Sequence, residues 1–265
     1  MTISSVNTDM VVLVTIMNDK VIGFVLKQSD YKDYSVILTV LTKEYGKLSI
    51  VASGIRKPTS KNAGRVLPYT KSEFLIDYKQ GKTIFTLKNV SLIKTYKKIH
   101  LDLNLSTCAS MMAEITDAFL MQGIESEYYE EVYDALDYSF SLLENQKDLI
   151  TILCLFCSTV MKCFGIGVDV DECVHCGSKL VQAISIKDGG FLCKECAQKD
   201  NIPLQDAVSL KRFRLVSKAS LNHYEIVEQA GGATFEDLNT FMQIIHTHTG
   251  IQIRSFELFS RIFKK

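Results

Sequence analysis

The chain has 265 residues, of which 30 are Lys or Arg and 30 are Asp or Glu, so its formal net charge is zero. An apolar fraction of 47% excludes wholesale disorder, and the length suits one large domain or two to three small ones. Residues 1–100 nevertheless carry 16 basic and 7 acidic side chains, net +9, and residues 101–265 carry net −9. Such asymmetry between halves indicates an anionic partner.

The longest apolar run near the N-terminus, Met10–Met17, has eight residues, whereas a membrane helix needs about 20. No basic segment precedes it, so a secretory signal is not expected. Eight cysteines in a core-rich chain fit a reducing compartment, where close pairs bind metal rather than form disulfides. We therefore expect a cytoplasmic protein without a membrane span.

The first third of the chain alternates short β-rich runs with turn residues, which predicts about five strands. The runs are Val21–Leu26, Tyr34–Thr42, Lys47–Ala52, Thr70–Tyr78 and Thr83–Leu87, with Val90–Tyr96 as an extension of the last. Gln80-Gly81 marks a hairpin between the fourth and fifth runs. Five short strands in this length predict a small barrel or sandwich.

A basic loop, Arg56–Pro68, separates the third and fourth strands and contains no acidic residue. Its cations are Arg56, Lys57, Lys61 and Arg65, and Lys43 and Lys47 bracket the preceding turn and extend the same groove. Aromatic residues accompany the strands, and we expect two of them, Phe24 and Phe74, to be core. Cations that follow phosphates beside rings that stack on bases are how OB-type barrels hold single strands.

From Leu103 the apolar period becomes helical, and residues 101–150 hold 11 acidic side chains against one lysine. The predicted helices are Ser106–Met121, Glu127–Leu143, Asp148–Phe164, Asp206–Ser220, Thr234–His248 and Ser255–Phe263. Gly123 fits a C-cap for the first of them, and Thr234–Asp237 reads as a capping box. The acidic block would repel DNA and could present a protein-binding face.

Two CxxC pairs, Cys173/Cys176 and Cys193/Cys196, are separated by 16 residues, the spacing of a zinc ribbon. Two such turns complete a closed tetrahedron without an open position, which favours one structural Zn²⁺ rather than a hydrolytic one. A third pair, Cys154 and Cys157, lies in an apolar helical run, and we interpret both as buried core residues. His175 lies between Cys173 and Cys176, and we interpret it as a residue that does not bind the metal. The sequence contains no recognisable Ser-His-Asp or Cys-His arrangement, so we do not predict catalysis.

The chain resembles the RecO family of bacterial DNA repair and recombination mediators over about residues 18–260. The resemblance is carried by Gly23–Leu26, by Tyr31–Asp33 leading into Leu38–Thr42, by Glu44–Lys47, by Val51–Lys57 and Ser60, by Leu67–Tyr69 and by the cysteine quartet. Residues 1–16 look like an extension before the usual start near Met17, and Ser35 stands where many relatives have an acid.

The resemblance implies an α+β multidomain protein. An OB-fold DNA-binding barrel would occupy residues 1–98, a helical domain residues 99–170 and 198–265, and a zinc-ribbon insertion residues 171–197. The family implies binding of single- and double-stranded DNA and annealing of complementary strands without ATP. It further implies partnership with RecR and single-strand-binding protein in loading recombinase at the nucleoid. On this interpretation Arg56, Lys57, Lys61 and Arg65 contact phosphates.

Two other classes stay open on the sequence. One is an RNA-binding OB-fold protein with a structural zinc ribbon, and preference for RNA over matched DNA would distinguish it. The other is a zinc-dependent nuclease, which would show nucleolytic turnover.

Overall fold

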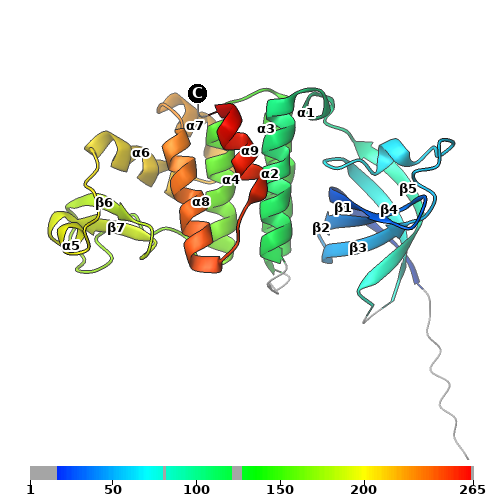
Figure 1. Cartoon of the computed structure of the whole chain (residues 1–265), viewed down its shortest axis with the longest axis horizontal. Helices are drawn as coiled ribbons and strands as arrows, with labels where there is room; N and C mark the ends of the chain where they lie inside the picture. The colour runs from blue at the N-terminus through cyan, green and yellow to red at the C-terminus, as the bar shows by residue number, and fades with distance from the viewer. Residues whose placement is uncertain (1–16, 80–81, 121–126, 264–265) are drawn as a thin grey trace, which may run out of the picture.

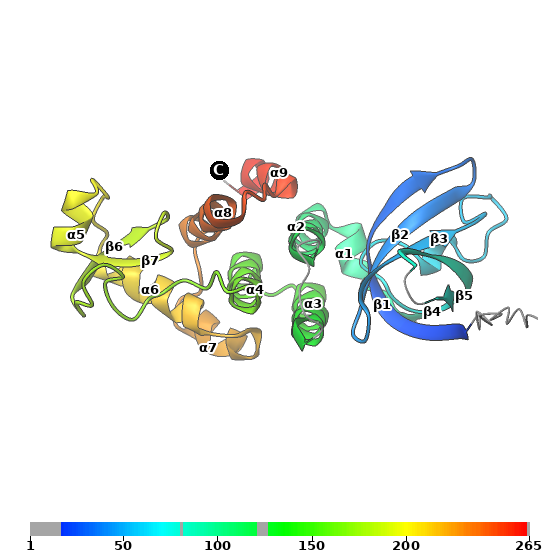
Figure 2. The ribbon, with the colours of Figure 1, turned by 90° about the horizontal axis from the view of Figure 1, so that it is seen from below.

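The computed structural model describes residues 17–79, 82–120 and 127–263. The predicted hairpin turn at Gln80-Gly81, the predicted C-cap at Gly123 and most of the apolar run Met10–Met17 lie outside these residues. A β-barrel stands at one end of the molecule, a bundle of helices in the middle and a small two-stranded unit at the other end (Figures 1 and 2). Within the described residues, no helix combines the length and the apolar character that crossing a bilayer requires.

The barrel has five strands in the closed order β1-β2-β3-β5-β4, so the sequence-based choice between barrel and sandwich is settled as an OB-type barrel. Its strands are β1 (Met17–Tyr31), β2 (Ser35–Thr42), β3 (Gly46–Ala52), β4 (Lys71–Tyr78) and β5 (Ile84–Lys94). The strand β1 is much longer than the predicted run, because its first half pairs with β4 and its second half with β2. A register shift between Val25 and Lys27 marks the bend. Parallel pairing of Ser49–Val51 with Ile84–Thr86 closes the barrel.

Four helices follow the barrel: α1 (Lys97–Leu101), α2 (Leu103–Leu120), α3 (Glu127–Glu144) and α4 (Leu149–Cys163). After the two-stranded unit come α6 (Ala207–Lys218), α7 (Tyr224–Gln229), α8 (Phe235–Thr249) and α9 (Arg254–Phe263). Helix α4 is the centre of the bundle, and twelve of its fifteen residues are buried. The Asp148 side chain caps α4, and the predicted capping box at Thr234 begins α8. Among these helices, sequence periodicity missed the short α1 and α7.

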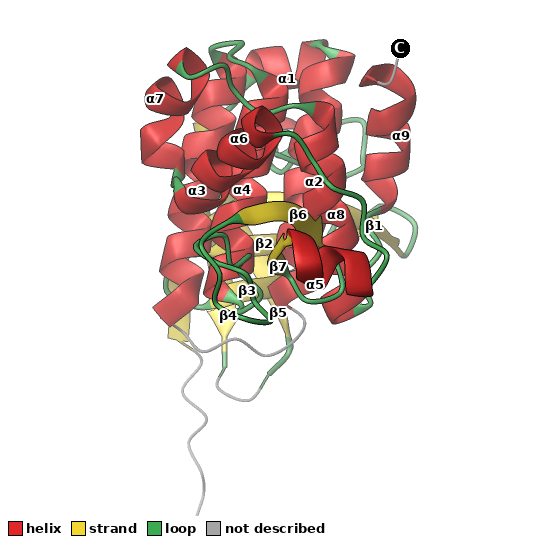
Figure 3. Ribbon diagram, turned by 90° about the vertical axis from the view of Figure 1, so that its left-hand side faces the viewer, coloured by secondary structure: helices red, strands yellow, loops and turns green. Residues whose placement is uncertain are grey.

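The cysteine-rich segment forms the hairpin β6 (Val181–Ser185) and β7 (Gly190–Cys193), followed by α5 (Lys194–Lys199). It enters from α4 and leaves into α6, and Figure 3 shows it in front of the bundle when the molecule is viewed from that end. Phe191 and Ile184 of this hairpin belong to the core of the bundle, whereas Cys173, Cys193 and Cys196 form a small buried cluster with Ala183, Leu192 and Ala197.

The barrel is packed onto the helices through a shared apolar core. Phe24, Leu26 and Leu41 belong to the core of the bundle, whereas Phe74 belongs to the interior of the barrel. The Phe24 ring lies 5.1 Å from the ring of Tyr133 and 5.7 Å from that of Phe140, both on α3. Full burial of one such ring contributes about 1.5–3 kcal/mol. The prediction that Phe24 and Phe74 are core residues is confirmed, since neither is exposed.

Candidate nucleic-acid interface and candidate metal centre

One group of barrel lysines is neutralised by the acidic helices. Lys27 and Lys47 place their Nζ atoms 2.6 and 2.9 Å from the two carboxylate oxygens of Asp117 on α2. Three further contacts join Lys43 to Glu130 at 2.8 Å, Lys43 to Asp134 at 3.2 Å, and Lys71 to Asp137 at 2.7 Å, all on α3. We call these four lysines the docked lysines. Much of the excess positive charge of the barrel is therefore neutralised by carboxylates of the helices.

Asp137 connects α3 to two residues of the N-terminal part of the chain. It accepts hydrogen bonds from Lys71 Nζ and, at 2.7 Å, from the Tyr96 hydroxyl. Lys71 Nζ also lies over the rings of Phe24 and Tyr133, 5.3 and 5.2 Å from their centroids. Burial raises the pKa of Asp137, but the hydrogen bonds from Lys71 and Tyr96 outweigh it, so the pKa lies below its usual value. The hydrogen bonds that Asp137 accepts from Lys71 and Tyr96 orient the barrel on α3.

Lys43 and Lys47, which the sequence predicted to extend a DNA groove, lie in this contact with the helices, and their role in DNA binding stays a prediction. Both face helices α2 and α3 rather than the loop, and their charges are opposed by carboxylates at hydrogen-bonding distance. Asp117, Asp134 and Asp137 of the acidic block are occupied by the barrel, and a protein-binding face on the rest of the block stays a prediction.

The loop between β3 and β4, residues 53–70, is held on the barrel by two apolar anchors. Ile55 and Val66 are buried in the barrel core, near the two ends of the basic segment. The backbone N–H of Arg56 donates to the Tyr34 carbonyl at 3.1 Å, and Gln28 Nε2 donates to the Val66 carbonyl at 2.5 Å. Anchors on both sides hold the cations between them at a defined place on the surface.

The four predicted loop cations occupy three different environments. Lys57 and Lys61 are exposed and have no ion-pair partner in the part of the chain that the structure describes. Arg56 pairs with Asp30 of β1, and the hydrogen bond from Arg56 lowers the pKa of Asp30. Arg65 donates to Asn62 Oδ1 at 3.0 Å and to the Val90 carbonyl of β5 at 3.1 Å. Arg65 therefore braces the loop, whereas Lys57 and Lys61 offer free charge.

Two of the candidate aromatic residues lie beside this loop with exposed rings. Tyr34, whose carbonyl accepts from Arg56, is 52% exposed, and Tyr31 is 37% exposed with Lys32 Nζ 5.3 Å above its ring. Other tyrosines of the barrel pack instead: Tyr69 stacks near His100, and Tyr78 lies between Tyr45 and Phe85. An open hollow of about 530 Å³, lined by Gln28, Arg56, Lys57 and Ser60 among others, runs along the loop.

The four ribbon cysteines converge on one point. One sulfur atom from each of Cys173, Cys176, Cys193 and Cys196 lies within 4.8 Å of the others, and Cys176 Sγ is 3.7 Å from Cys193 Sγ. Four thiolates at about 2.3 Å from one ion in a tetrahedron would be about 3.8 Å apart, so this arrangement fits Zn²⁺. Burial raises the pKa of Cys173, but N–H groups of Cys193, His175 and Cys176 outweigh it and lower the pKa to about 6. The cluster could hold a metal ion.

His175 and the third CxxC pair lie outside the four-sulfur cluster. The His175 ring lies between Asp188 and Asp200, 3.2 and 3.6 Å from their carboxylates, and outside the four-sulfur cluster. Cys154 and Cys157 are fully buried in α4, and burial raises the pKa of Cys157 to about 12. Neither residue contributes to the sulfur cluster.

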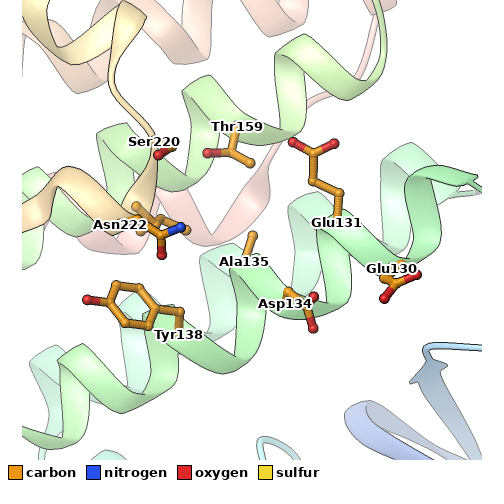
Figure 4. Close-up of a pocket in the computed structure, with 9 residues that line it drawn as sticks. Glu130, Glu131, Asp134, Ala135, Tyr138, Thr159, Ser220 and Asn222 are labelled. Atoms are coloured by element: carbon orange, nitrogen blue, oxygen red, sulfur yellow. The ribbon is translucent and has the colours of Figure 1, made fainter.

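A separate cavity of about 430 Å³ lies between α3, α4 and residues 220–222 (Figure 4). Three carboxylates, Glu130, Glu131 and Asp134, line one side of it. Two of them already bind Lys43, so the cavity borders the contact between barrel and bundle.

Comparison with known proteins connects the barrel, bundle and cysteine cluster to one family. A profile described as "Recombination protein O N terminal" matches residues 17–96, and one described as "Recombination protein O C terminal" matches residues 100–223. A protein named DNA repair protein RecO from Bacillus pumilus is 30% identical over 78% of this chain and 81% of its own length. The chain belongs to the RecO family of DNA repair proteins.

Other RecO proteins are similar in sequence over most of this chain and of their own length. The relative from Bacillus cytotoxicus is 27% identical over 94% of this chain and 99% of its own, and that from Caldicellulosiruptor bescii is 28% identical over 76% and 86%. The two RecO profiles cover the barrel, the cysteine cluster and helices α2 to α6, and the second ends at residue 223, before α7, α8 and α9.

Lys27 and Lys71 are interface residues that sequence reasoning missed. A partial signal exists in α3, where Glu130, Asp134 and Asp137 follow each other at helical spacing and form one stripe. The stripe indicates a charged contact but does not name its partner, because the lysines are 66 to 91 residues away in sequence.

Proposed function

We propose that this RecO-family chain binds single- and double-stranded DNA through the loop between β3 and β4 and anneals complementary strands without ATP. With RecR, it would help load recombinase on strands coated by single-strand-binding protein, as a non-enzymatic mediator acting at the nucleoid. We propose that Lys57 and Lys61 contact phosphates. Arg56 would leave Asp30 to bind a phosphate, and Arg65 would hold the loop in place. The division at residues 98, 170 and 198 into barrel, bundle and ribbon belongs to the same proposal.

The observation that supports DNA binding is the positive charge of Lys57 and Lys61, which is not paired with a carboxylate among the described residues. Their loop is anchored by Ile55 and Val66, so two unpaired ammonium groups stand at fixed positions beside the exposed rings of Tyr31 and Tyr34. Phosphates bind to such cations with release of counterions, and aromatic rings accept any base. Annealing requires neutralisation of two strands more than readout of base edges, so this arrangement supports it.

The test is the double variant Lys57→Glu/Lys61→Glu, with affinity for labelled single strands measured by fluorescence anisotropy over a range of salt. Two lost phosphate contacts should reduce the salt slope by about 1.4 for single strands and about 1.8 for duplex, with affinity at least about tenfold weaker. The matched control, Lys187→Glu/Lys211→Glu, changes net charge equally at exposed positions on the ribbon and α6, and should bind normally. Unchanged binding by the loop variant, or a strong preference of the wild type for matched RNA, would refute the proposal.

The mediator part has a separate readout. Complementary strands coated with single-strand-binding protein should anneal in the presence of this chain and without nucleotide. The loop variant should anneal them more slowly. Annealing no faster than with the coating protein alone would contradict this part and leave the binding measurement standing.

We further propose that Cys173, Cys176, Cys193 and Cys196 hold one structural Zn²⁺ per chain. Four protein thiolates leave no open position, so the ion would stabilise the ribbon against α6 rather than activate water. Cys196→Ser should lose the metal and lower the unfolding temperature, because binding free energy of such sites is folding free energy. Cys163→Ser, a thiol outside the cluster, should keep one zinc per chain by elemental analysis. A stable, zinc-free Cys196→Ser protein would exclude the structural role.

A further inference from the structure

A second hollow adjoins the proposed DNA-binding loop on the side facing the helices. Its volume is about 490 Å³, and it lies between β1, α2 and the first residue of α9, Arg254. Gln28 lines both this hollow and the one along the loop, and the consecutive residues Leu67 and Pro68 line one each. The two hollows therefore meet at Gln28 and Pro68. Helix α9 lies along α2, as both ribbon views show (Figures 1 and 2).

Two cationic and two acidic side chains line the second hollow: Lys27, Arg254, Glu114 and Asp117. Lys27 shares the carboxylate of Asp117 with Lys47, which does not line the hollow. The guanidinium of Arg254 is exposed and has no ion-pair partner among the residues that the structure describes. Glu114 is the other carboxylate of the hollow, and its oxygens accept from the N–H groups of Arg254 and Ser255 and from the Ser255 hydroxyl.

The junction between the hollows is held in an unusual backbone conformation. Tyr69 follows Pro68 with a φ of 66°, in the left-handed region that a bulky residue rarely adopts. Its N–H donates to the Val25 carbonyl at 2.7 Å, and its ring packs near His100 and Phe140 on the helix side. Strained backbone of this kind is typical of binding sites. Tyr69 itself lines the second hollow, next to Pro68.

We propose that a single DNA strand bound at the loop continues past Gln28 and Pro68 into the second hollow and places a phosphate on Arg254. This inference rests on the proposed DNA binding and adds its route: the strand runs from the barrel onto the start of α9. Free cations stand at both ends of the route, Lys57 and Lys61 at one and Arg254 at the other. The docked Lys27 lies between them, sharing Asp117. Cations spaced along a groove are how single-strand channels follow a backbone.

The length of the DNA strand distinguishes binding along the whole route from binding at the loop alone. An OB fold alone occupies roughly 4–16 nucleotides, so oligothymidylates of about 8 and about 30 nucleotides would report on the loop and on the whole route respectively. Arg254→Glu should weaken binding of the long strand about fivefold, reduce its salt slope by about 0.7 and leave the short strand within about twofold. Because glutamate is favourable at a helix N-terminus, α9 should remain folded. Arg254→Gln should give a smaller loss in the same direction.

The matched control is Arg261→Glu, which reverses an exposed arginine in the last turn of the same helix, outside the hollow. It should bind both strands as the wild type does. Equal effects of Arg254→Glu on both lengths, or no effect on either, would overturn the route while Lys57→Glu/Lys61→Glu still weakens both. If the loop variant also binds both strands normally, the proposed DNA site fails and the route falls with it.

Discussion

The docked lysines and the loop cations belong to the same barrel, but they face different surroundings. Lys71 is 19% exposed and lies between Asp137 and two aromatic rings, whereas the Arg56 side chain is 45% exposed and its partner Asp30 is 79% exposed. A charge in the first setting is stabilised by the protein itself, and a charge in the second is mostly stabilised by water. Only the second is readily available to a phosphate, because binding then exchanges water and small ions rather than a half-buried carboxylate.

The difference shows why a surplus of basic residues does not measure a DNA-binding surface. The barrel half carries nine more cationic than acidic side chains, but four of its lysines are opposed by Asp117, Glu130, Asp134 and Asp137 of the bundle. Their role is to fix the barrel on α2 and α3, together with the burial of Phe24. The chemistry of a lysine in this fold is therefore decided by the residue opposite to it.

The largest expected effect comes from removing the central carboxylate of the docked group. Asp137→Ala leaves Lys71 Nζ and the Tyr96 hydroxyl without their acceptor in a half-buried contact. We expect a loss of about 2–3 kcal/mol in the free energy of unfolding, measured by urea denaturation, because an unpaired charge beside apolar rings is costly. Affinity for single strands should change less than twofold.

Asp134→Ala is the matched control, one turn earlier on α3. The Asp134 side chain is 59% exposed, against 31% for Asp137, so its pairing with Lys43 should contribute about 0–1 kcal/mol. Equal losses for the two variants would show that the docked lysines do not differ from surface pairs.

The second-largest effect is expected from acid, which should weaken the contact between the docked lysines and the helices. Burial raises the pKa of Asp117 and of Asp137, but hydrogen bonds from lysines outweigh it and leave both values below those of the unfolded chain. Carboxylates with lowered pKa contribute stability that is complete above about pH 4 and is lost as pH falls through their folded pKa values. Urea denaturation from about pH 7 to about pH 3 should show this fall. The curve of Asp117→Asn should be shallower below about pH 4, and superimposable curves would contradict the assignment.

Features encoded by neighbouring residues were predictable from the sequence. The CxxC pairs place four sulfurs together because each knuckle is local and one hairpin joins them. The starts of α4 and α8 follow from Asp148 and Thr234, whose side chains cap the next turn. The strand β1 was predicted too short, because its two halves are stabilised by different partners that lie far away in sequence.

The state of each cation could not be predicted in the same way. Lys43 and Lys47 look like the loop lysines in sequence, and only the packing of Phe24 and Leu41 against the bundle brings them to the carboxylates of α3 and α2. The same holds for Arg65, whose bond to the Val90 carbonyl depends on where β5 passes the loop. Sequence therefore predicted which residue types the site uses, and tertiary packing determined which of them are free.

The smallest expected effect is on the loop itself. Asp30→Asn removes the carboxylate that pairs with Arg56 and competes with phosphate for its guanidinium. Since exposed pairs are weak, single-strand affinity should rise by no more than about fivefold at low salt, with the free energy of unfolding nearly unchanged. Asp33→Asn makes the same change in net charge at an exposed position nearby and should have less effect. In an Arg56→Gln background, Asp30→Asn should lose its specific effect, and an equal gain there would mean that Asp30 acts through net charge rather than through Arg56.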